Sequence, residues 1–251
     1  MRVARFSLNG EPKFGILDGP ELVLLKGHPL VLGYETTGER VPLKDVKLLA
    51  PTIPSKVVCI GKNYTDHVGE MGLELNPEPT IFLKPSSSII GPGDSIVLPT
   101  QSNHVDLEVE LTIVMGQIAK NVSEKDALNY VWGFTIANDV TARDLQASDD
   151  QWARSKSFDT FCPLGPWIET EFVPDGQILE SRIDGDTKQQ ASIDLMIHNV
   201  PKLISYVSHN MTLLPGDVIL TGTPAGITRI SSGELVECEV EGIGTLINPV
   251  V

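Results

Sequence analysis

Two glutamates, Glu108 and Glu110, lie two residues apart in the otherwise apolar stretch HVDLEVELTIVM (residues 104–115). In a β-strand, side chains at positions i and i+2 point to the same face, about 7 Å apart along the chain. Two carboxylates at this spacing can bind one hard divalent cation such as Mg²⁺ or Mn²⁺, which prefer oxygen ligands. The alternative is an antiparallel strand with one face in water, where the same acids are merely solvated.

A third carboxylate favours the cation site over the solvated face. Asp139 lies at the end of the apolar stretch YVWGFTIANDV (residues 130–140), which we expect to form a long strand. Three carboxylates carried at strand ends would form an open oxygen-ligand site. We therefore predict that Glu108, Glu110 and Asp139 bind one divalent cation, which requires the side chains of Glu108 and Asp139 to lie within about 8 Å of each other.

The segment GKNYTDHVGEMG (residues 61–72) is bounded by glycines and contains His67 and Glu70. One helical turn places residues three apart side by side, and the carboxylate would then orient the imidazole and increase its basicity. The pair suits a general base, and the alternative is a chance pair on a surface turn. The polar composition also predicts a lid over residues 65–75 that becomes ordered over the metal when substrate binds.

Polar residues in three further segments could contact a substrate. Arg143 and Gln146 follow the third acid in TARDLQ, and an arginine suits two-point binding of a carboxylate, with a surface salt bridge as the alternative. Lys156 either forms a structural ion pair with Asp159 or donates to an oxyanion or enolate. The loop LTGTPAGI offers backbone N–H groups and the Thr223 hydroxyl to an anion. It lacks the full phosphate-loop pattern, so we do not predict nucleotide binding.

Short strands separated by turns must position these residues. The 22 glycines and 18 prolines are spread along the chain as turn residues. We predict strands over residues 104–115 and 95–99, a hairpin over residues 178–193 that turns at Asp184-Gly185, and a helix over residues 200–211. Helix is the minority, which predicts a β-rich α+β fold.

The first part of the chain reads as a small β unit. RVARFSL, FGILDG and ELVLL are strand-like, and the proline-containing stretch LLAPTIPSK (residues 48–56) reads as a linker or entry strand. We place a boundary near Pro51, which divides the chain into a small N-terminal β domain (residues 1–50) and a larger domain (residues 51–251) that carries the candidate site residues.

Composition excludes several classes of partner. The 251 residues carry a formal net charge of −14 and an isoelectric point near 4.7, which disfavours nucleic acid and anionic membranes. The three cysteines are far apart, which indicates reduced thiols. No apolar run has the length of a membrane span, and the first residues lack the apolar region of a signal peptide. We expect a cytoplasmic protein.

Seven segments, in this order along the chain, resemble the fumarylacetoacetate hydrolase family. They are IGKNYTDHVGEMG, PTIFLKPSSSIIGPGDSIVLP, HVDLEVELTIVMG, GFTIANDVTARDLQ, WARSKSFDTFCPLGPWI, MTLLPGDVILTGTPAGI and VEGIGTLINPVV. Each is weak alone, but the ordered set is specific and covers nearly everything from residue 51 onward. The N-terminal β unit resembles the extension found in the bacterial 2-hydroxyhepta-2,4-diene-1,7-dioate isomerase and oxaloacetate decarboxylase-like subgroup.

The resemblance implies a fold, a cofactor and roles for the candidate residues. It implies the rolled β-sandwich of the family's C-terminal domain, a homodimer, and Mg²⁺ or Mn²⁺ held by the three acids named above. Lys156 matches the family's active-site lysine, and His67 and Glu70 match the dyad of the lid. Arg143 and Thr223, together with Gln146, match positions that contact substrate.

The implied activity is chemistry on a small-molecule 2-oxo acid through a metal-bound enolate. The subgroup favours isomerisation of 2-hydroxyhepta-2,4-diene-1,7-dioate or decarboxylation of oxaloacetate, on 2-oxo or 2-hydroxydienoic dicarboxylates. The matching dyad also keeps hydrolysis of acylpyruvate or fumarylacetoacetate-type C–C bonds as an alternative. A hypothesis of another class is a non-catalytic β-rich binding protein whose acids hold a structural cation.

Overall fold

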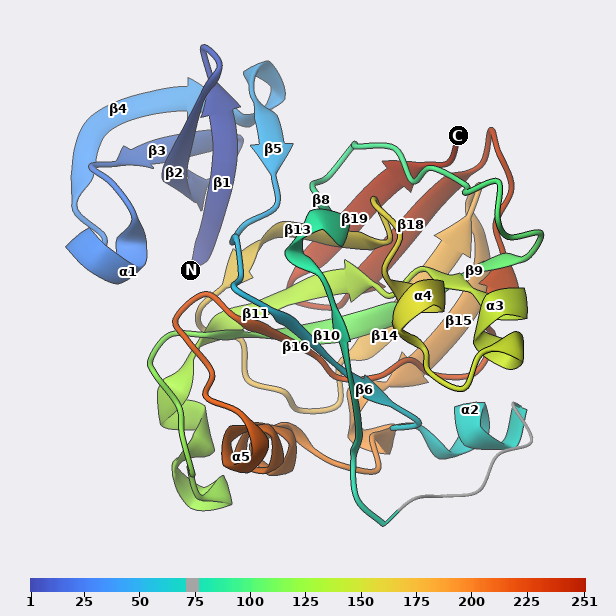
Figure 1. Ribbon diagram of the computed structural model, residues 1–251. Coiled ribbons are helices and arrows are strands. Elements are labelled where there is room, and N and C mark those ends of the chain that lie inside the picture. The colour runs from blue at the N-terminus through green and yellow to red at the C-terminus, as the bar shows by residue number, and fades with distance from the viewer. Residues whose placement is uncertain (71–76) are drawn as a thin grey trace.

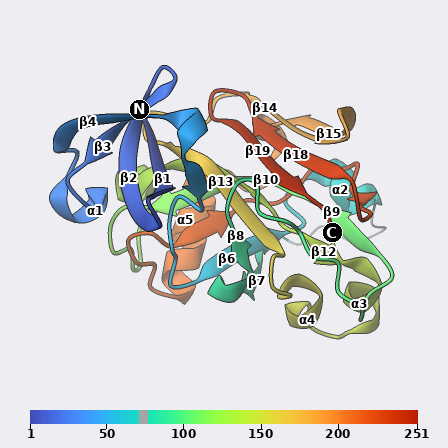
Figure 2. The ribbon, with the colours of Figure 1, turned by 90° about the horizontal axis from the view of Figure 1, so that it is seen from above.

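The computed structural model describes residues 1–70 and 77–251, apart from the side chains of His67, Val68 and Glu70. Two views at right angles show the N-terminal strands on one side of the molecule and the short helices α2, α3 and α4 on the opposite side (Figures 1 and 2). Most regular elements are strands, as the sequence predicted. Within the described part of the chain, no helix is both long enough and apolar enough to cross a membrane.

The strands run along the whole chain and the helices between them are short. The strands are β1 (Arg2–Leu8), β2 (Glu11–Asp18), β3 (Glu21–Leu25), β4 (Thr36–Pro42), β5 (Lys47–Leu49), β6 (Val57–Gly61), β7 (Thr80–Lys84), β8 (Ile89–Ile90), β9 (Val105–Leu107), β10 (Val109–Met115), β11 (Val131–Asn138), β12 (Thr141–Ala142), β13 (Cys162–Glu169), β14 (Ile178–Ile183), β15 (Asp186–Ser192), β16 (Val218–Leu220), β17 (Thr228–Arg229), β18 (Leu235–Val240) and β19 (Gly244–Pro249). The α-helices are α1 (Pro29–Leu32), α2 (Thr65–Glu70), α3 (Arg143–Ser148), α4 (Ala153–Lys156) and α5 (Val200–Asn210), and the 3₁₀ helices are η1 (Leu43–Asp45), η2 (Ser86–Ser88), η3 (Glu124–Tyr130) and η4 (Ile193–Leu195).

Three sheets make up the fold. The large sheet runs in the order β4-β3-β2-β1-β13-β11-β10-β16-β6-β7, with β5 paired to β1 and β8 paired to β13. A small sheet has the order β12-β9-β17, and the third has the order β15-β14-β18-β19. The main hydrophobic core includes buried side chains of β10, β11, β14, β18 and α5. A second buried cluster includes Val114 of β10 together with residues of β6, β13 and β16, so β10 is buried on both faces.

The predicted strand over residues 104–115 is broken at Glu108. Residues 105–107 form β9 and pair with β12 and β17, whereas β10 pairs with β11 and β16 in the large sheet. At the break, the Glu108 backbone N–H donates to the side chain of Asn138, the last residue of β11 (2.9 Å). A period-two pattern records alternating faces but carries no signal that the chain changes sheets.

Two other predicted elements are confirmed and one is not. The hairpin β14–β15 turns at Asp184 and Gly185, which both have positive φ (51° and 86°), as a two-residue type I′ turn requires. Helix α5 begins after Asn199, whose side chain accepts from the Lys202 N–H. The strand predicted over residues 95–99 is wrong, because the segment forms only one isolated bridge, between Ile96 and Val250.

The N-terminal β unit joins the large sheet at one edge. Strand β1 pairs antiparallel with the end of β13, through Arg2 with Glu169 and Val3 with Ile168. Strands β1 to β5 otherwise pair among themselves. We propose a domain boundary near Pro51, supported by the position of this unit at the side of the molecule (Figure 1).

Asp217, which directly precedes β16 of the large sheet, binds Ser55 and Lys56 of the segment that follows the N-terminal β unit. Its side chain is fully buried, and one carboxylate oxygen accepts from the N–H (2.9 Å) and the hydroxyl (2.7 Å) of Ser55. The other oxygen accepts from the Leu214 N–H (2.8 Å) and pairs with the Lys56 ammonium. Burial alone would raise the pKa of Asp217, but the bonds from Lys56, Leu214 and Ser55 outweigh it and lower the pKa.

We predict that Asp217→Asn lowers the free energy of unfolding by about 2–4 kcal/mol at pH 7, because it leaves buried donors without an ionised partner. The folded-state pKa is depressed, so the stabilisation is present above the unfolded pKa and is lost as pH falls through the folded value. Urea unfolding at pH 7 and pH 3 measures the difference. The exposed Asp175→Asn is the control and should change the unfolding energy by less than about 0.5 kcal/mol. A pH-independent difference would contradict the role given to the Asp217 charge.

Candidate active site

Three carboxylates meet beside the paired strands β10 and β11. Glu108, Glu110 and Asp139 are 3%, 2% and 1% exposed, and each offers an oxygen within 4.8 Å of the others. The hairpin-like pairing of β10 and β11 brings them together, because the Asp139 N–H bonds to the Glu108 carbonyl (2.9 Å) where β11 ends. The distance required of one shared cation is met, and the alternative of a strand face in water is wrong.

Two buried lysines neutralise part of this negative charge. The Lys156 ammonium bonds to Glu108 (2.8 Å) and Asp139 (2.6 Å). The Lys84 ammonium bonds to the second oxygen of Asp139 (2.5 Å) and to the carbonyl of Val140 (3.0 Å). Burial alone would lower the pKa of Lys156, but Asp139 and Glu108 raise it above its ordinary value. Lys156 is therefore an ammonium at neutral pH, able to donate but not to accept a proton.

Glu110 has no cationic partner among the described residues. Its side chain accepts one hydrogen bond, from the Gly222 N–H (2.6 Å). Burial, together with the charges of Asp139 and Glu108, raises the pKa of Glu110 well above its ordinary value. Gly222 can make this contact because it has φ +101° and because a Cβ there would lie 2.7 Å from the Cβ of Asn63.

This arrangement fits a divalent cation. A buried carboxylate without a counter-charge is costly unless a cation neutralises it or a proton binds to it. Three carboxylates supply the hard oxygen donors that Mg²⁺ and Mn²⁺ prefer. Each carboxylate oxygen has two lone pairs, so Glu108 and Asp139 can keep their lysine bonds while contacting a cation.

Arg143, the first residue of α3, forms an ion pair with one of the three carboxylates, Glu108. Its guanidinium donates to Asp106 (2.7 Å), to Glu108 and to the side-chain oxygen of Gln146. Three of its five N–H groups are thus engaged, which leaves two for a ligand. Burial disfavours its charge, but Glu108 and Asp106 outweigh this and raise the pKa of Arg143. The alternative of a surface salt bridge is wrong, because the Arg143 side chain is 13% exposed.

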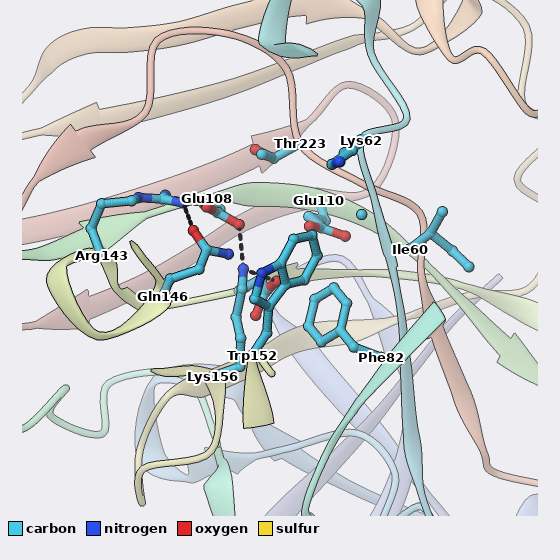
Figure 3. Close-up of a pocket in the computed structure, with 12 residues that line it drawn as sticks. Ile60, Lys62, Phe82, Glu108, Glu110, Arg143, Gln146, Trp152, Lys156 and Thr223 are labelled. Carbon is cyan, nitrogen blue, oxygen red and sulfur yellow. Dashed lines mark hydrogen bonds and ion pairs between the residues drawn. The ribbon is translucent and has the colours of Figure 1, made fainter. Parts of the chain in front are cut away.

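A pocket lies over these groups and is shown in Figure 3. Arg143 and Gln146 enter it from α3, while Lys156 lies opposite Thr223 (Figure 3). The pocket is lined by Ile60, Gly61, Lys62, Phe82, Glu108, Glu110, Asp139, Arg143, Gln146, Trp152, Lys156 and Thr223. The alternative of an ion pair between Lys156 and Asp159 is not observed, since Lys156 pairs with the two acids of the cluster. Phe82 packs against the Lys156 ammonium at 5.0 Å from the ring centroid.

Sequence reasoning missed Lys62 and Lys84. Lys62 lines the pocket in a left-handed backbone conformation (φ 62°), which is uncommon for a residue other than glycine. No carboxylate of the described part of the chain pairs with it, so its ammonium can take an anionic group. Its position directly after an apolar strand was the available signal. Lys84 also ends an apolar strand, but nothing in its own segment indicates a partner 55 residues away.

The predicted helical turn around His67 and Glu70 is present as α2. The side chains of both residues lie outside the described part, as do residues 71–75 of the predicted lid. Their catalytic roles and the ordering of residues 65–75 therefore stay predictions. Helix α2 begins four residues after the end of β6, and Gly61 and Lys62 of that connection line the pocket.

Comparison with known proteins places the chain in a family. Residues 56–251 match the family model described as fumarylacetoacetate (FAA) hydrolase C-terminal, and residues 1–51 match one described as Rv2993c-like, N-terminal. The chain belongs to the fumarylacetoacetate hydrolase family. Within that family it is 53% identical to Protein Rv2993c of Mycobacterium tuberculosis over 262 residues, covering 100% of this chain and 98% of that protein.

Relatives with named activities are enzymes. The chain is 45% identical over 224 residues to the mitochondrial oxaloacetate tautomerase FAHD2A of Homo sapiens, covering 84% of this chain and 71% of that protein. A crystal structure of 5-carboxymethyl-2-hydroxymuconate delta-isomerase from Mycobacterium smegmatis superposes with a TM-score of 0.93 at 45% identity, covering 100% of this chain and 99% of that one. The predicted fold and family are confirmed.

We predict that a divalent cation reverses the effect of Glu110→Gln on stability. Without a cation, the variant should equal or exceed the wild type, because it removes a buried charge that Glu108 and Asp139 repel. With Mg²⁺ or Mn²⁺ at about 100 times the dissociation constant, the wild type should gain about 2.7 kcal/mol and the variant much less.

Thermal unfolding of the wild type and of Glu110→Gln, first after chelation and then with added cation, measures their stabilities in both conditions. Glu39→Gln, at an exposed position, should respond to the cation as the wild type does. Equal stabilisation of the wild type and Glu110→Gln would place the cation elsewhere.

Proposed function

We propose that the chain is a divalent-metal-dependent enzyme that moves a proton on 2-oxo or 2-hydroxydienoic dicarboxylates by way of an enolate. Isomerisation and keto–enol tautomerisation are both reactions of this kind, and decarboxylation of oxaloacetate shares the same enolate. The observation that carries the proposal is a single pocket lined by three buried carboxylates and the ammonium groups of Lys156 and Lys62. The isomerase and tautomerase names of the relatives support it.

Glu108, Glu110 and Asp139 would hold the cation. A bound Mg²⁺ or Mn²⁺ supplies Lewis acidity towards the oxygens of a chelating 2-oxo acid. The donor set does not distinguish the two metals, since both accept carboxylate and water oxygens.

Lys156 would stabilise the negative charge that develops on the substrate. When a base removes the proton from C3, the electron pair of that C–H bond moves into the C2 carbonyl and leaves an enolate oxygen. An ammonium already held in place by Glu108 and Asp139 can donate to that oxygen without reorganising. The proton then returns to the oxygen in tautomerisation, or to another carbon in isomerisation.

We place the proton acceptor outside Lys156 and Arg143, because both are ion-paired with carboxylates of the site. We propose that His67, oriented by Glu70, fills this role, as the spacing of the pair suggests. The described pocket residues support this assignment indirectly, since their carboxylates are committed to the cation site or to basic partners.

Lys62 and Arg143 would bind the carboxylates of the substrate. Lys62 contributes an ammonium without a carboxylate partner in the described residues, and Arg143 has two N–H groups left over. Gln146, bonded to Arg143, would add a further contact, and the Thr223 hydroxyl would accept from a donor elsewhere on the substrate. Two cationic groups in one pocket suit a dicarboxylate better than a monocarboxylate.

We predict that variants separate the possible reactions. Glu110→Gln should abolish all of them, because each needs the cation. His67→Ala should destroy acylpyruvate hydrolysis, which needs water activated by a general base, a contribution of typically 10²–10⁴-fold. It should lower oxaloacetate decarboxylation least, because the departing CO₂ leaves the electrons behind. Isomerisation, which needs a proton shuttle but no water, should fall in between.

The measurement is kcat/KM for oxaloacetate, an acylpyruvate and the seven-carbon dienedioate, in wild type and both variants. Glu39→Gln serves as the control and should match the wild type. If acylpyruvate hydrolysis exceeds the other activities of the wild type by orders of magnitude, the reaction class is wrong and the chain is a C–C hydrolase. If the cation binds and none of the substrates reacts, the non-catalytic binding protein is the better description.

A further inference from the structure

Gln189 of β15 lies behind the pocket and connects two of the sheets. Its side chain is 1% exposed and makes four hydrogen bonds. The amide oxygen accepts from the Val109 N–H (3.0 Å) and the Ser181 hydroxyl (3.0 Å). The amide nitrogen donates to the Thr223 hydroxyl (2.8 Å) and the Pro224 carbonyl (2.8 Å). Every donor of this amide is therefore used.

The orientation of the Gln189 amide follows from its backbone partners. The Val109 N–H can only donate, so the atom facing it must be the amide oxygen. The Pro224 carbonyl can only accept, so the atom facing it must be the amide nitrogen. Exchanging the two ends would break both bonds, which removes the usual ambiguity of amide side chains.

This orientation of the Gln189 amide determines whether the Thr223 hydroxyl can donate a hydrogen bond to a ligand or accept one from it. The hydroxyl donates its one proton to the Val109 carbonyl (2.9 Å) and receives an N–H of Gln189. A hydroxyl has one proton and two lone pairs. One lone pair therefore remains, and Thr223 can accept from a ligand but has no proton to donate to it.

Thr223 lines the pocket (Figure 3), and Val109 lies between the two glutamates of the candidate metal site. We propose that Gln189 is a positioning residue that makes Thr223 a hydrogen-bond acceptor, so that the pocket selects ligands presenting a donor there. This inference rests on the proposed function: an acceptor at Thr223 would favour the enol tautomer of a 2-oxo acid, whose hydroxyl can donate, over the keto tautomer, which has no such donor.

A pair of similar inhibitors tests the polarity of Thr223. Oxalate and oxamate both resemble a chelating 2-oxo acid, but only the amide of oxamate carries N–H donors. We would measure dissociation constants of both by calorimetry on the Mg²⁺-loaded wild type, Gln189→Met, Thr223→Val and Thr223→Ser. For each protein we would divide the dissociation constant of oxalate by that of oxamate. A loss of affinity that affects both inhibitors equally leaves this ratio unchanged.

Relative to the wild type, the ratio should fall about three- to tenfold in Gln189→Met and Thr223→Val, the effect of one hydrogen bond. Without the Gln189 N–H, the Thr223 hydroxyl is held only by its bond to the Val109 carbonyl, which it can give up to turn its proton towards the ligand. Valine offers no acceptor. Thr223→Ser keeps the hydroxyl and should keep the ratio. If Gln189→Met does not fold, Thr223→Val and Thr223→Ser still show whether Thr223 acts as an acceptor towards the ligand.

An unchanged ratio in Thr223→Val overturns the proposal, as does a fall of the same size in Thr223→Ser. These outcomes are distinct from failure of the proposed function. In that case the Mg²⁺-loaded wild type would bind neither inhibitor, or would bind both without turning over any of the 2-oxo acids tested.

Discussion

The candidate site gathers three negatively charged carboxylates in the protein interior, and the surrounding groups must neutralise that charge. Glu108, Glu110 and Asp139 place carboxylate oxygens within 4.8 Å of one another where almost no solvent reaches. Such a cluster is unfavourable unless cations neutralise it. Lys84 and Lys156 supply two positive charges, and both are held against Asp139. Glu110 is left with a single backbone donor, which is why a divalent cation fits this side of the cluster.

The fold meets this constraint by bringing together segments that are far apart in sequence. Strands β10 and β11 place the acids, the end of β7 places Lys84, and α4 places Lys156. The helices α3 and α4 lie between β12 and β13 in the chain and at the same side of the molecule in both views (Figures 1 and 2). Gln189 then ties the β14–β15 hairpin to β10 and to the Thr223 loop. The site is thus held by elements of the large sheet, the hairpin and two short helices.

Local pattern was enough to predict the acids but not all of their partners. The two glutamates in an apolar strand and the aspartate at the end of another indicated a shared site, and the helix spacing of residues 200–211 predicted α5. Lys84 and Gln189 were missed because each acts through contacts with residues distant in sequence, and Lys62 was missed although it directly follows an apolar strand. Gln189 meets Val109 across 80 positions of the chain, a pairing that no local periodicity encodes.

The structure departs from the predicted strands at two places, for a related reason. Apolar and polar residues alternate over residues 104–115 as they would in one strand. The backbone nevertheless changes sheets at Glu108, whose N–H donates to the side chain of Asn138. Residues 95–99 are apolar enough for a strand, but they lie beside the C-terminal residues with only one bridge. In both cases the pattern predicted extended backbone, and the choice of partner depended on distant residues.

Anomalous scattering from crystals grown with Mn²⁺ would show whether the carboxylate cluster binds a cation. One strong peak is expected about 2.0–2.3 Å from oxygens of Glu108, Glu110 and Asp139, with water or ligand oxygens completing the coordination. A protein saturated with Mn²⁺ that shows its peak elsewhere, with Glu110 bonded only to Gly222, would contradict this expectation.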